Sequence, residues 1–390
     1  MKKPGPSQPA PPPAGEADPK PRPAEATDPE RRSTSSHGSD SGSLSRRGFV
    51  THAAAAGAGG LLANVAVGRD RELAAAAPGN AERQPGAGSA SIPKRPFGRT
   101  GSEISIVGFG AGSRFYGSTP DDETGAELIR AAIERGVDFV ETGANYGGEE
   151  GISERRIGLA MRTHRNRVFL ETKVDERDYD GAMREMERSM DRMQTDHLDL
   201  VLHHLLRNEE EVAQVAGNGG AEGAIRKMMD EGVVRHRGLS AHTPEVARAG
   251  LEQLDPEAIQ LPINAVRVPD FEAEIIPAAA EAGVAVIAMK TCGNGYFFPA
   301  NATTPDRIER YGPPEGAWDR WDLPTWTDYI HYVLSLPIAT ATIGIDSYFT
   351  LEGVTAAAST FAPLAPERMA SIHQRAQVFS TTGYWIPRRG

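Results

Sequence analysis

The sequence predicts an α/β protein in which residues 92–390 form a (β/α)8 TIM barrel, preceded by a disordered N-terminal region and a signal segment. Short β-branched runs alternate with longer segments of helical periodicity, and eight such runs can be counted. About 300 residues remain once the N-terminal region is set aside, a length that one barrel domain fills.

The first segment, residues 1–44, is rich in proline, as in "PGPSQPAPPPAGEADPKPRPAE". Such a composition supplies too little apolar surface to offset the entropy of ordering the chain. We therefore expect these residues to be disordered.

Residues 45–77 have the pattern of a twin-arginine export signal. Arg46 and Arg47 precede an Ala- and Gly-rich apolar run, and Ala74 to Ala77 provide small residues for cleavage. A membrane-spanning helix needs about 20 strongly apolar residues, and this run is less apolar than that. We therefore expect no stable membrane span. We expect the twin-arginine machinery to export the protein to the periplasmic or extracellular side, with residues 78–91 as a linker. The alternative is an Ala- and Gly-rich linker that follows two arginines by chance.

The barrel strands are expected where β-branched residues cluster between helical segments such as "DDETGAELIRAAIERG" and "PEVARAGLEQL". Before them, "KRPFGRTGSE" predicts a hairpin that plugs the lower end of the barrel. A doubly wound open sheet is the alternative, but "GFGAGS" at 108–113 is only a weak match to its glycine-rich turn. The expected strands are 104–110, 137–142, 168–174, 198–204, 234–241, 258–264, 284–290 and 339–345.

Composition excludes several classes of function. The chain has 42 Lys and Arg against 53 Asp and Glu, a net charge of −11, and no basic stripe in the folded part, so nucleic acid is not an expected partner. The single cysteine, Cys292, excludes an intrachain disulfide and a cluster of thiolate metal ligands. We interpret Cys292 as a small apolar filler.

Four polar residues follow successive expected strands and should meet at one rim of the barrel. Glu141 and Tyr146 follow the second strand, Lys173 the third and His204 the fourth. An ammonium beside a tyrosine stabilises the phenolate and lowers the pKa, and Glu141 can hold that ammonium. A neutral histidine can point an N–H at a carbonyl oxygen. The set fits carbonyl reduction, in which a cofactor supplies hydride and tyrosine supplies the proton.

The adjacent histidines His203 and His204 suggest a metal site at first sight. Neighbouring residues on a strand face opposite sides, so both cannot easily hold one ion. We expect no metal, and we expect His203 to pack outside the barrel.

From about residue 95 to about residue 361, the chain resembles the aldo-keto reductase superfamily. The matching segments include "GVDFVETGANYG" from Gly136, "ETKV" with Lys173 and "HLDLVLHH" with His204. "GLSAHTPEV", "IQLPINA" and "TIGIDSYFTLEGV" match later segments that bind the cofactor. The resemblance implies that Tyr146 is the general acid, that Lys173 lowers its pKa and that His204 orients the carbonyl. It also implies NADP or NAD as cofactor and a small carbonyl or alcohol as substrate.

The same resemblance assigns the cofactor-binding residues and shows where this chain departs from the family. The second strand ends in Glu141 where aspartate is usual, and Ala241 replaces the usual asparagine. A methionine takes the place of the aromatic residue that stacks on nicotinamide. After Gly344, Asp346 should repel a 2′-phosphate and accept hydrogen bonds from ribose hydroxyls. The preference for NADP that the family implies is therefore weakened, and NAD is favoured more. The implied cofactor-binding residues are Gly110, Ser240, Gln260, Met289, Gly344 and Asp346.

Three hypotheses about function follow. The first is an exported NAD(P)-dependent oxidoreductase that interconverts an aldehyde or ketone with its alcohol. The second is a catalytically impaired barrel that senses a nicotinamide cofactor or binds a partner. The third is another barrel enzyme, an isomerase or hydrolase, but 258–264 and 339–345 lack the paired carboxylates or metal ligands it would need. The long connection 291–326 is rich in Gly, Pro and aromatic residues; it either covers an extended substrate or only the barrel rim.

Overall fold

A computed structural model describes residues 91–266, 269–293 and 323–382. Within these residues eight parallel strands close into a barrel in the order β10-β3-β4-β5-β6-β7-β8-β9, so the predicted TIM barrel is confirmed. The expected disordered region, the signal segment and all but the last residue of the linker lie outside the described residues. So does most of the long connection 291–326.

Each expected strand segment contains or overlaps one barrel strand. The longest, β6, runs two residues past its expected end. The barrel strands are β3 (Val107–Gly110), β4 (Phe139–Glu141), β5 (Phe169–Val174), β6 (Leu198–Leu206), β7 (Val234–Ala241), β8 (Ala258–Pro262), β9 (Ala285–Met289) and β10 (Thr340–Gly344).

The first expected strand, 104–110, is two strands. β2 (Glu103–Ser105) pairs antiparallel with β1 (Lys94–Pro96), and β3 begins after it at Val107. The predicted hairpin is thereby confirmed, with the short 3-10 helix η1 (Gly98–Thr100) at its turn. Phe97 is fully buried, and its ring lies 4.9 Å from that of Phe169 at the start of β5. The hairpin therefore closes the N-terminal end of the barrel.

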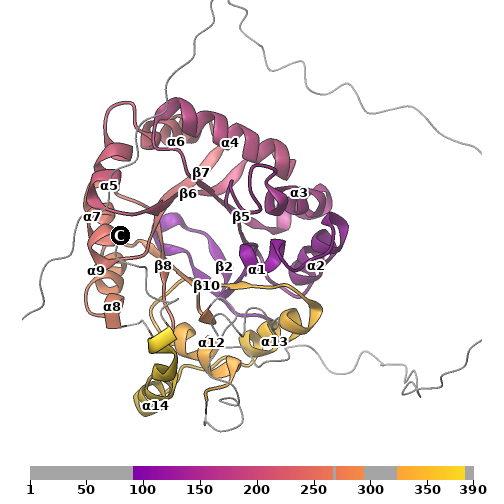
Figure 1. Ribbon diagram of the computed structural model, residues 1–390, viewed down its shortest axis with the longest axis vertical. Coiled ribbons are helices and arrows are strands. Elements are labelled where there is room, and N and C mark those ends of the chain that lie inside the picture. The colour runs from indigo at the N-terminus through magenta and orange to yellow at the C-terminus, as the bar shows by residue number, and fades with distance from the viewer. Residues whose placement is uncertain (1–90, 267–268, 294–322, 383–390) are drawn as a thin grey trace, which may run out of the picture. The chain divides into compact units, whose positions relative to one another are not determined.

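Helices surround the strands (Figure 1). Many begin where a side-chain oxygen caps the first turn, as Asp121 does by accepting from the backbone N–H of Thr124. Other short elements are α1 (Ser113–Tyr116), η2 (Arg165–Arg167) and η5 (Gln377–Thr382). The remaining helices are α2 (Asp122–Glu134), α3 (Ile152–His164), α4 (Tyr179–Met193), α5 (Glu209–Ala216), α6 (Ala221–Asp230), α7 (Pro244–Leu254), α8 (Pro269–Glu272), α9 (Ile275–Glu281), α12 (Trp326–Leu334), α13 (Tyr348–Ser359) and α14 (Pro366–Ala376).

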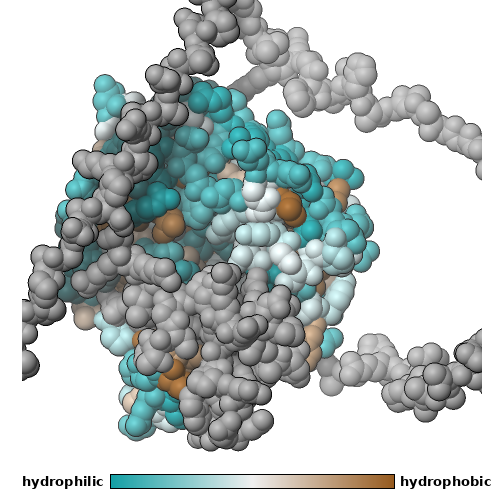
Figure 2. Space-filling model, viewed as in Figure 1, coloured by the Kyte–Doolittle hydropathy of each residue, from teal (hydrophilic) through white to brown (hydrophobic). Residues whose placement is uncertain are grey.

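The hydrophobic core has two parts. The larger lies between strands and helices, and the smaller fills the lower barrel interior around Phe97 and Phe139. The face in Figure 2 is mainly hydrophilic over the helices. Among the described residues, the exposed large hydrophobic side chains are Tyr348 and Phe349. Those residues contain no helix that is both long and apolar enough to cross a membrane.

Candidate active site

Three neighbouring strands bring the expected catalytic residues to one rim. β4 ends at Glu141, β5 carries Lys173, and β6 carries His204. Tyr146 follows β4 and lies beside two of them: its ring centroid is 5.2 Å from the Lys173 Nζ and 5.7 Å from the centre of the His204 ring. The strand ends of a parallel barrel thus place four distant sequence positions in one site.

Lys173 is buried, and its ammonium has three oxygen neighbours. Nζ donates to Glu141 and to the Thr142 carbonyl oxygen at 2.7 Å, and it forms an ion pair with Glu171, whose Oε1 lies 3.0 Å away but accepts no hydrogen bond within the described residues. Burial lowers the pKa of Lys173, but the carboxylates of Glu141 and Glu171 together raise it by more, so its pKa lies above the usual value. Two carboxylates and one carbonyl oxygen thus hold the ammonium.

The hydroxyl of Tyr146 donates to Glu141 Oε1 at 3.2 Å. Burial and the Glu141 carboxylate raise the pKa of Tyr146 above its usual value, while Lys173 lowers it. Lys173 therefore lowers the pKa of Tyr146 in the expected direction. Burial, and after it the Glu141 carboxylate that contacts both the ammonium and the phenol, outweigh this effect and leave the net pKa raised.

His204 pairs with a residue that the sequence analysis did not single out. Its Nδ1 lies 2.8 Å from Asp175 Oδ1, just beyond the end of β5. An ionised carboxylate only accepts, so Nδ1 carries a proton in this contact. The other nitrogen, Nε2, then donates to a carbonyl only when the ring holds both protons.

His203 faces away from these residues, as expected for the neighbouring position on a strand. It is fully buried, and its Nε2 lies 3.0 Å from Glu222 Oε2 on α6, outside the barrel. In the part of the chain that the structure describes, no three His, Cys, Asp or Glu side chains are grouped to hold a metal ion.

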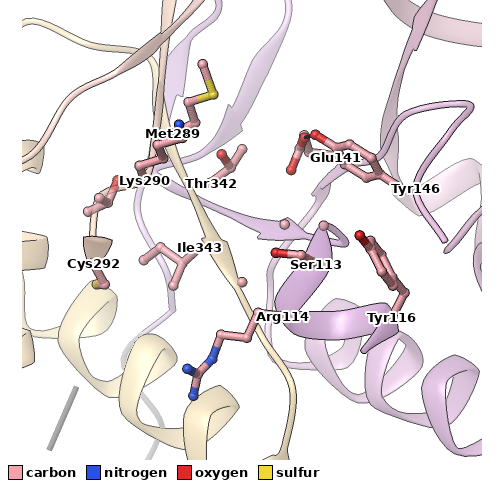
Figure 3. Close-up of a pocket in the computed structure, with 14 residues that line it drawn as sticks. Ser113, Arg114, Tyr116, Glu141, Tyr146, Met289, Lys290, Cys292, Thr342 and Ile343 are labelled. Atoms are coloured by element: carbon pink, nitrogen blue, oxygen red, sulfur yellow. Dashed lines mark hydrogen bonds between the residues drawn. The ribbon is translucent and has the colours of Figure 1, made fainter. Parts of the chain in front are cut away.

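A pocket opens beside Tyr146 at the ends of β3, β4, β9 and β10 (Figure 3). Tyr146 and Glu141 lie on one side of it, and Met289 lies across from them. Of the six expected cofactor residues, Gly110, Met289 and Gly344 belong to the lining. The other lining residues are Gly112, Ser113, Arg114, Tyr116, Lys290, Thr291, Cys292, Thr342 and Ile343.

Ser240 and Gln260 lie on neighbouring strands β7 and β8 and differ in their bonding. The Ser240 hydroxyl accepts from the backbone N–H of Leu205 at 2.7 Å, where Leu205 has a positive φ of 45°. Gln260 is fully buried, and neither its Oε1 nor its Nε2 has a hydrogen-bond partner within the described residues. A buried amide without partners is costly, so Gln260 is suited to pair with a ligand.

Asp346 forms an ion pair inside the protein. Its Oδ2 lies 2.8 Å from Nε of Arg114, both side chains are largely buried, and Oδ1 accepts from the Thr350 hydroxyl at 2.7 Å. Any nucleotide phosphate near Asp346 would therefore meet an aspartate already paired with an arginine. The sequence analysis missed Arg114 because only the pairing of β10 with β3 brings the two residues together.

Glu171 is a second residue that the sequence analysis missed. Its side chain is fully buried, two positions before Lys173 on β5. Burial raises the pKa of Glu171 to about 8, with Glu141 adding to the rise and Lys173 opposing it. Residues two apart on a strand share a face, so the alternation in "ETKV" already placed Glu171 beside Lys173.

The model of the "Aldo/keto reductase family" matches residues 107–327, more than half of the chain. A probable aldo-keto reductase of Glycine max is 25% identical over 228 residues, which cover 53% of this chain and 62% of the relative. The match thus spans less than two thirds of that relative's length.

Solved structures share the fold. An aldo-keto reductase of Bacillus halodurans in its holo form superposes with a TM-score of 0.58 and 20% identity, over 76% of this chain and 99% of that one. An aldo/keto reductase of Klebsiella pneumoniae, solved with NADP and acetate, gives a TM-score of 0.55 and 21% identity, over 75% and 95% of the two chains. From the matched family model, together with this barrel, the chain belongs to the aldo/keto reductase family.

Proposed function

We propose that this protein is an NAD(P)-dependent oxidoreductase that interconverts a small aldehyde or ketone with its alcohol by hydride transfer. The observation that carries the proposal is the meeting of Tyr146, Lys173, Glu141 and His204 at one barrel rim beside a pocket. Family membership and the NADP in a solved neighbour support a nicotinamide cofactor.

The residues present fit such a cofactor. The amide of Gln260 is buried without a partner and matches the donor and acceptor of a carboxamide. A Cβ on Gly110 would stand 3.1 Å from the Ile343 backbone and 3.3 Å from Glu141, so glycine keeps this side of the pocket open. The Met289 thioether offers a flat, polarizable contact for a ring. Bound there, NAD(P)H supplies hydride to the carbonyl carbon.

The side chains of the protein handle the proton and the orientation. His204, whose Nδ1 contacts Asp175, donates from Nε2 to the carbonyl oxygen when that nitrogen carries a proton, and so holds the oxygen in place. Tyr146 gives its hydroxyl proton to that oxygen as the alcohol forms. The Lys173 ammonium stabilises the phenolate left behind, which regains a proton from solvent before the next cycle.

Nucleotide choice depends on Arg114 and Asp346. Ribose hydroxyls can donate to Asp346 while its ion pair with Arg114 stays intact. A 2′-phosphate would have to draw Arg114 away from Asp346. We therefore favour NAD over NADP, with both accepted.

A second candidate is a cofactor-sensing or partner-binding barrel with impaired catalysis. The specific observation in its favour is that the Tyr146 hydroxyl donates to Glu141, while Lys173 donates to Glu141 and the Thr142 carbonyl and forms an ion pair with Glu171. Turnover distinguishes this candidate from the first.

The expected location is also a proposal. The twin-arginine pattern of residues 45–77 supports export to the periplasmic or extracellular side, after folding and cofactor binding inside the cell.

The test is a fluorescence titration of residues 78–390 with NADH and NADPH, followed by a panel of aldehydes and ketones. We expect binding of both nucleotides and turnover, with kcat lowered about 10²- to 10⁴-fold in Tyr146→Phe. Tyr179→Phe, on α4 outside the barrel, is the matched control and should keep wild-type turnover. Binding without turnover on any substrate favours the sensing barrel, and no binding of either nucleotide contradicts both candidates.

A further inference from the structure

Glu171 is a carboxyl group buried inside the barrel, below the candidate active site. In the parallel sheet it pairs with Glu141 on β4 and with Leu200 on β6, and its side chain is fully buried. Burying such a group is costly unless a cation or donor compensates it. The contact that compensates it is Lys173 Nζ, 3.0 Å from Oε1.

That contact decides what Lys173 can do. Glu141 and the Thr142 carbonyl accept hydrogen bonds from the ammonium, and Glu171 holds it through an ion pair. The Tyr146 hydroxyl donates to Glu141. Removing Glu171 would take away one of the two carboxylates that hold the ammonium.

We propose that Glu171 is a positioning residue: through its buried ion pair with Lys173 it holds the ammonium inside the barrel and keeps Tyr146 a protonated phenol. This inference rests on the proposed function, because it gives Glu171 a role in the same site. In this role, Glu171 keeps the proton donor for carbonyl reduction available.

Both carboxylates beside the ammonium raise the pKa of Tyr146. Burial raises the pKa of Tyr146 most, Glu141 and Glu171 raise it further, and Lys173 lowers it. Glu171, with its pKa raised to about 8, is a carboxylate well before a tyrosine titrates at its usual value near 10. The two carboxylates then surround one ammonium and disfavour the phenolate.

The groups that face Lys173 come from three strands. β4 contributes Glu141 and, just after its end, Tyr146; β5 contributes Glu171. β6 has the apolar residues Leu200 and Leu202 at the matching register positions. The next titratable pair toward the rim is His204 with Asp175, which bond to each other.

The test compares Glu171→Leu, which removes charge and contact, with Glu171→Gln, which removes the charge and keeps an acceptor. Glu257→Gln, before β8 at the opposite end of the barrel, is the control. Tyrosinate absorbance is recorded against pH, and the signal of Tyr146 is isolated by subtracting the same variant carrying Tyr146→Phe. We expect the midpoint to fall by about one pH unit or more in Glu171→Leu, less in Glu171→Gln, and not in the control.

The same shift should appear in kinetics. Alcohol oxidation needs the phenolate as base, so its rate increases as the pH passes the pKa of Tyr146. In Glu171→Leu this increase should begin at a lower pH than in the wild type. An unchanged tyrosine midpoint in folded Glu171→Leu overturns the inference. Loss of fold in both variants, seen by circular dichroism, makes Glu171 a structural residue and also overturns it. A shifted midpoint in a protein that turns over no substrate supports the inference while the proposed oxidoreductase fails.

Discussion

Glu141 carries one methylene more than the aspartate usual at this strand end, and this length changes the hydrogen bonds of the site. Its carboxylate bonds to the Lys173 ammonium and also accepts from the Tyr146 hydroxyl. The longer side chain is evident from the sequence, but its second contact is not, because that contact depends on where the loop after β4 places the tyrosine.

The raised pKa of Tyr146 predicts the pH dependence of reduction. The proton stays on the phenol to higher pH, so we expect no fall in the reduction rate from tyrosine ionisation until beyond its usual value near 10. Glu141→Gln removes one carboxylate that raises the pKa, and the fall should then move to lower pH. The measurement is kcat/KM for a carbonyl substrate against pH, with the exposed Glu103→Gln on β2 as control. Identical profiles in wild type and Glu141→Gln would contradict this account of the pKa.

Asp175 sets the tautomer of His204, which predicts a second effect on catalysis. With Nδ1–H directed at the carboxylate, a neutral ring carries no proton on Nε2. In Asp175→Asn the amide can donate to Nδ1, and the neutral ring then keeps its proton on Nε2, where it can donate to a carbonyl oxygen. We expect kcat/KM for carbonyl reduction to rise in Asp175→Asn and to stay at the wild-type value in the control Asp196→Asn, beside His197. An unchanged kcat/KM in Asp175→Asn would show that Asp175 does not set the donor.

Some residues of the site could be found from the sequence and others could not. Tyr146, Lys173 and His204 stand at fixed places relative to successive strands, so spacing was enough. Glu171 could have been found from strand alternation, since it is two residues from Lys173. Arg114 could not, because its ion pair with Asp346 depends on which strands become neighbours when the barrel closes.

At the level of elements, β-branched runs predicted where the barrel strands lie, and the errors lie at their ends. The hairpin strand β2 and the barrel strand β3 share one hydrophobic run, so periodicity merged them. Leu205 and Lys290 adopt positive φ values of 45° and 58° where β6 and β9 meet the rim. Non-glycine residues rarely adopt this conformation, and nothing in the hydrophobic pattern signals it.

Gly238 on β7 lies where β7 and β8 pack closely, which predicts the effect of adding a side chain there. A Cβ there would stand 2.0 Å from the Ala258 carbonyl oxygen on β8 and 2.8 Å from the Leu202 side chain, and the backbone atom cannot yield without moving its strand. We expect Gly238→Ala to lower the free energy of unfolding by about 1–3 kcal/mol in denaturant titrations. The control is Gly223→Ala in α6, whose Cβ would meet Tyr179 at 3.4 Å and which should gain about 0.5–1 kcal/mol. Equal stabilities of the two variants would refute the packing argument.

At the scale of the whole molecule, eight alternating units were enough to predict closure, because each strand of such a barrel needs a neighbour on both sides. The position of the pocket was less predictable. It lies toward β3, β9 and β10, next to the point where the last strand pairs with the first. This closing contact joins the two ends of the barrel domain, so the pocket forms only when the whole domain has folded.

That dependence gives the proposed export route a physical reason, since a cofactor pocket built from both ends of the domain favours transport of an already folded protein. We expect replacement of Arg46 and Arg47 by lysine to keep the protein in the cytoplasm, because the adjacent arginines define the signal. The matched control replaces Arg31 and Arg32, an arginine pair with no apolar run after it, and should leave export intact. Cell fractionation with mass measurement of the exported form locates both variants. Equal export of the two would identify residues 45–77 as a linker.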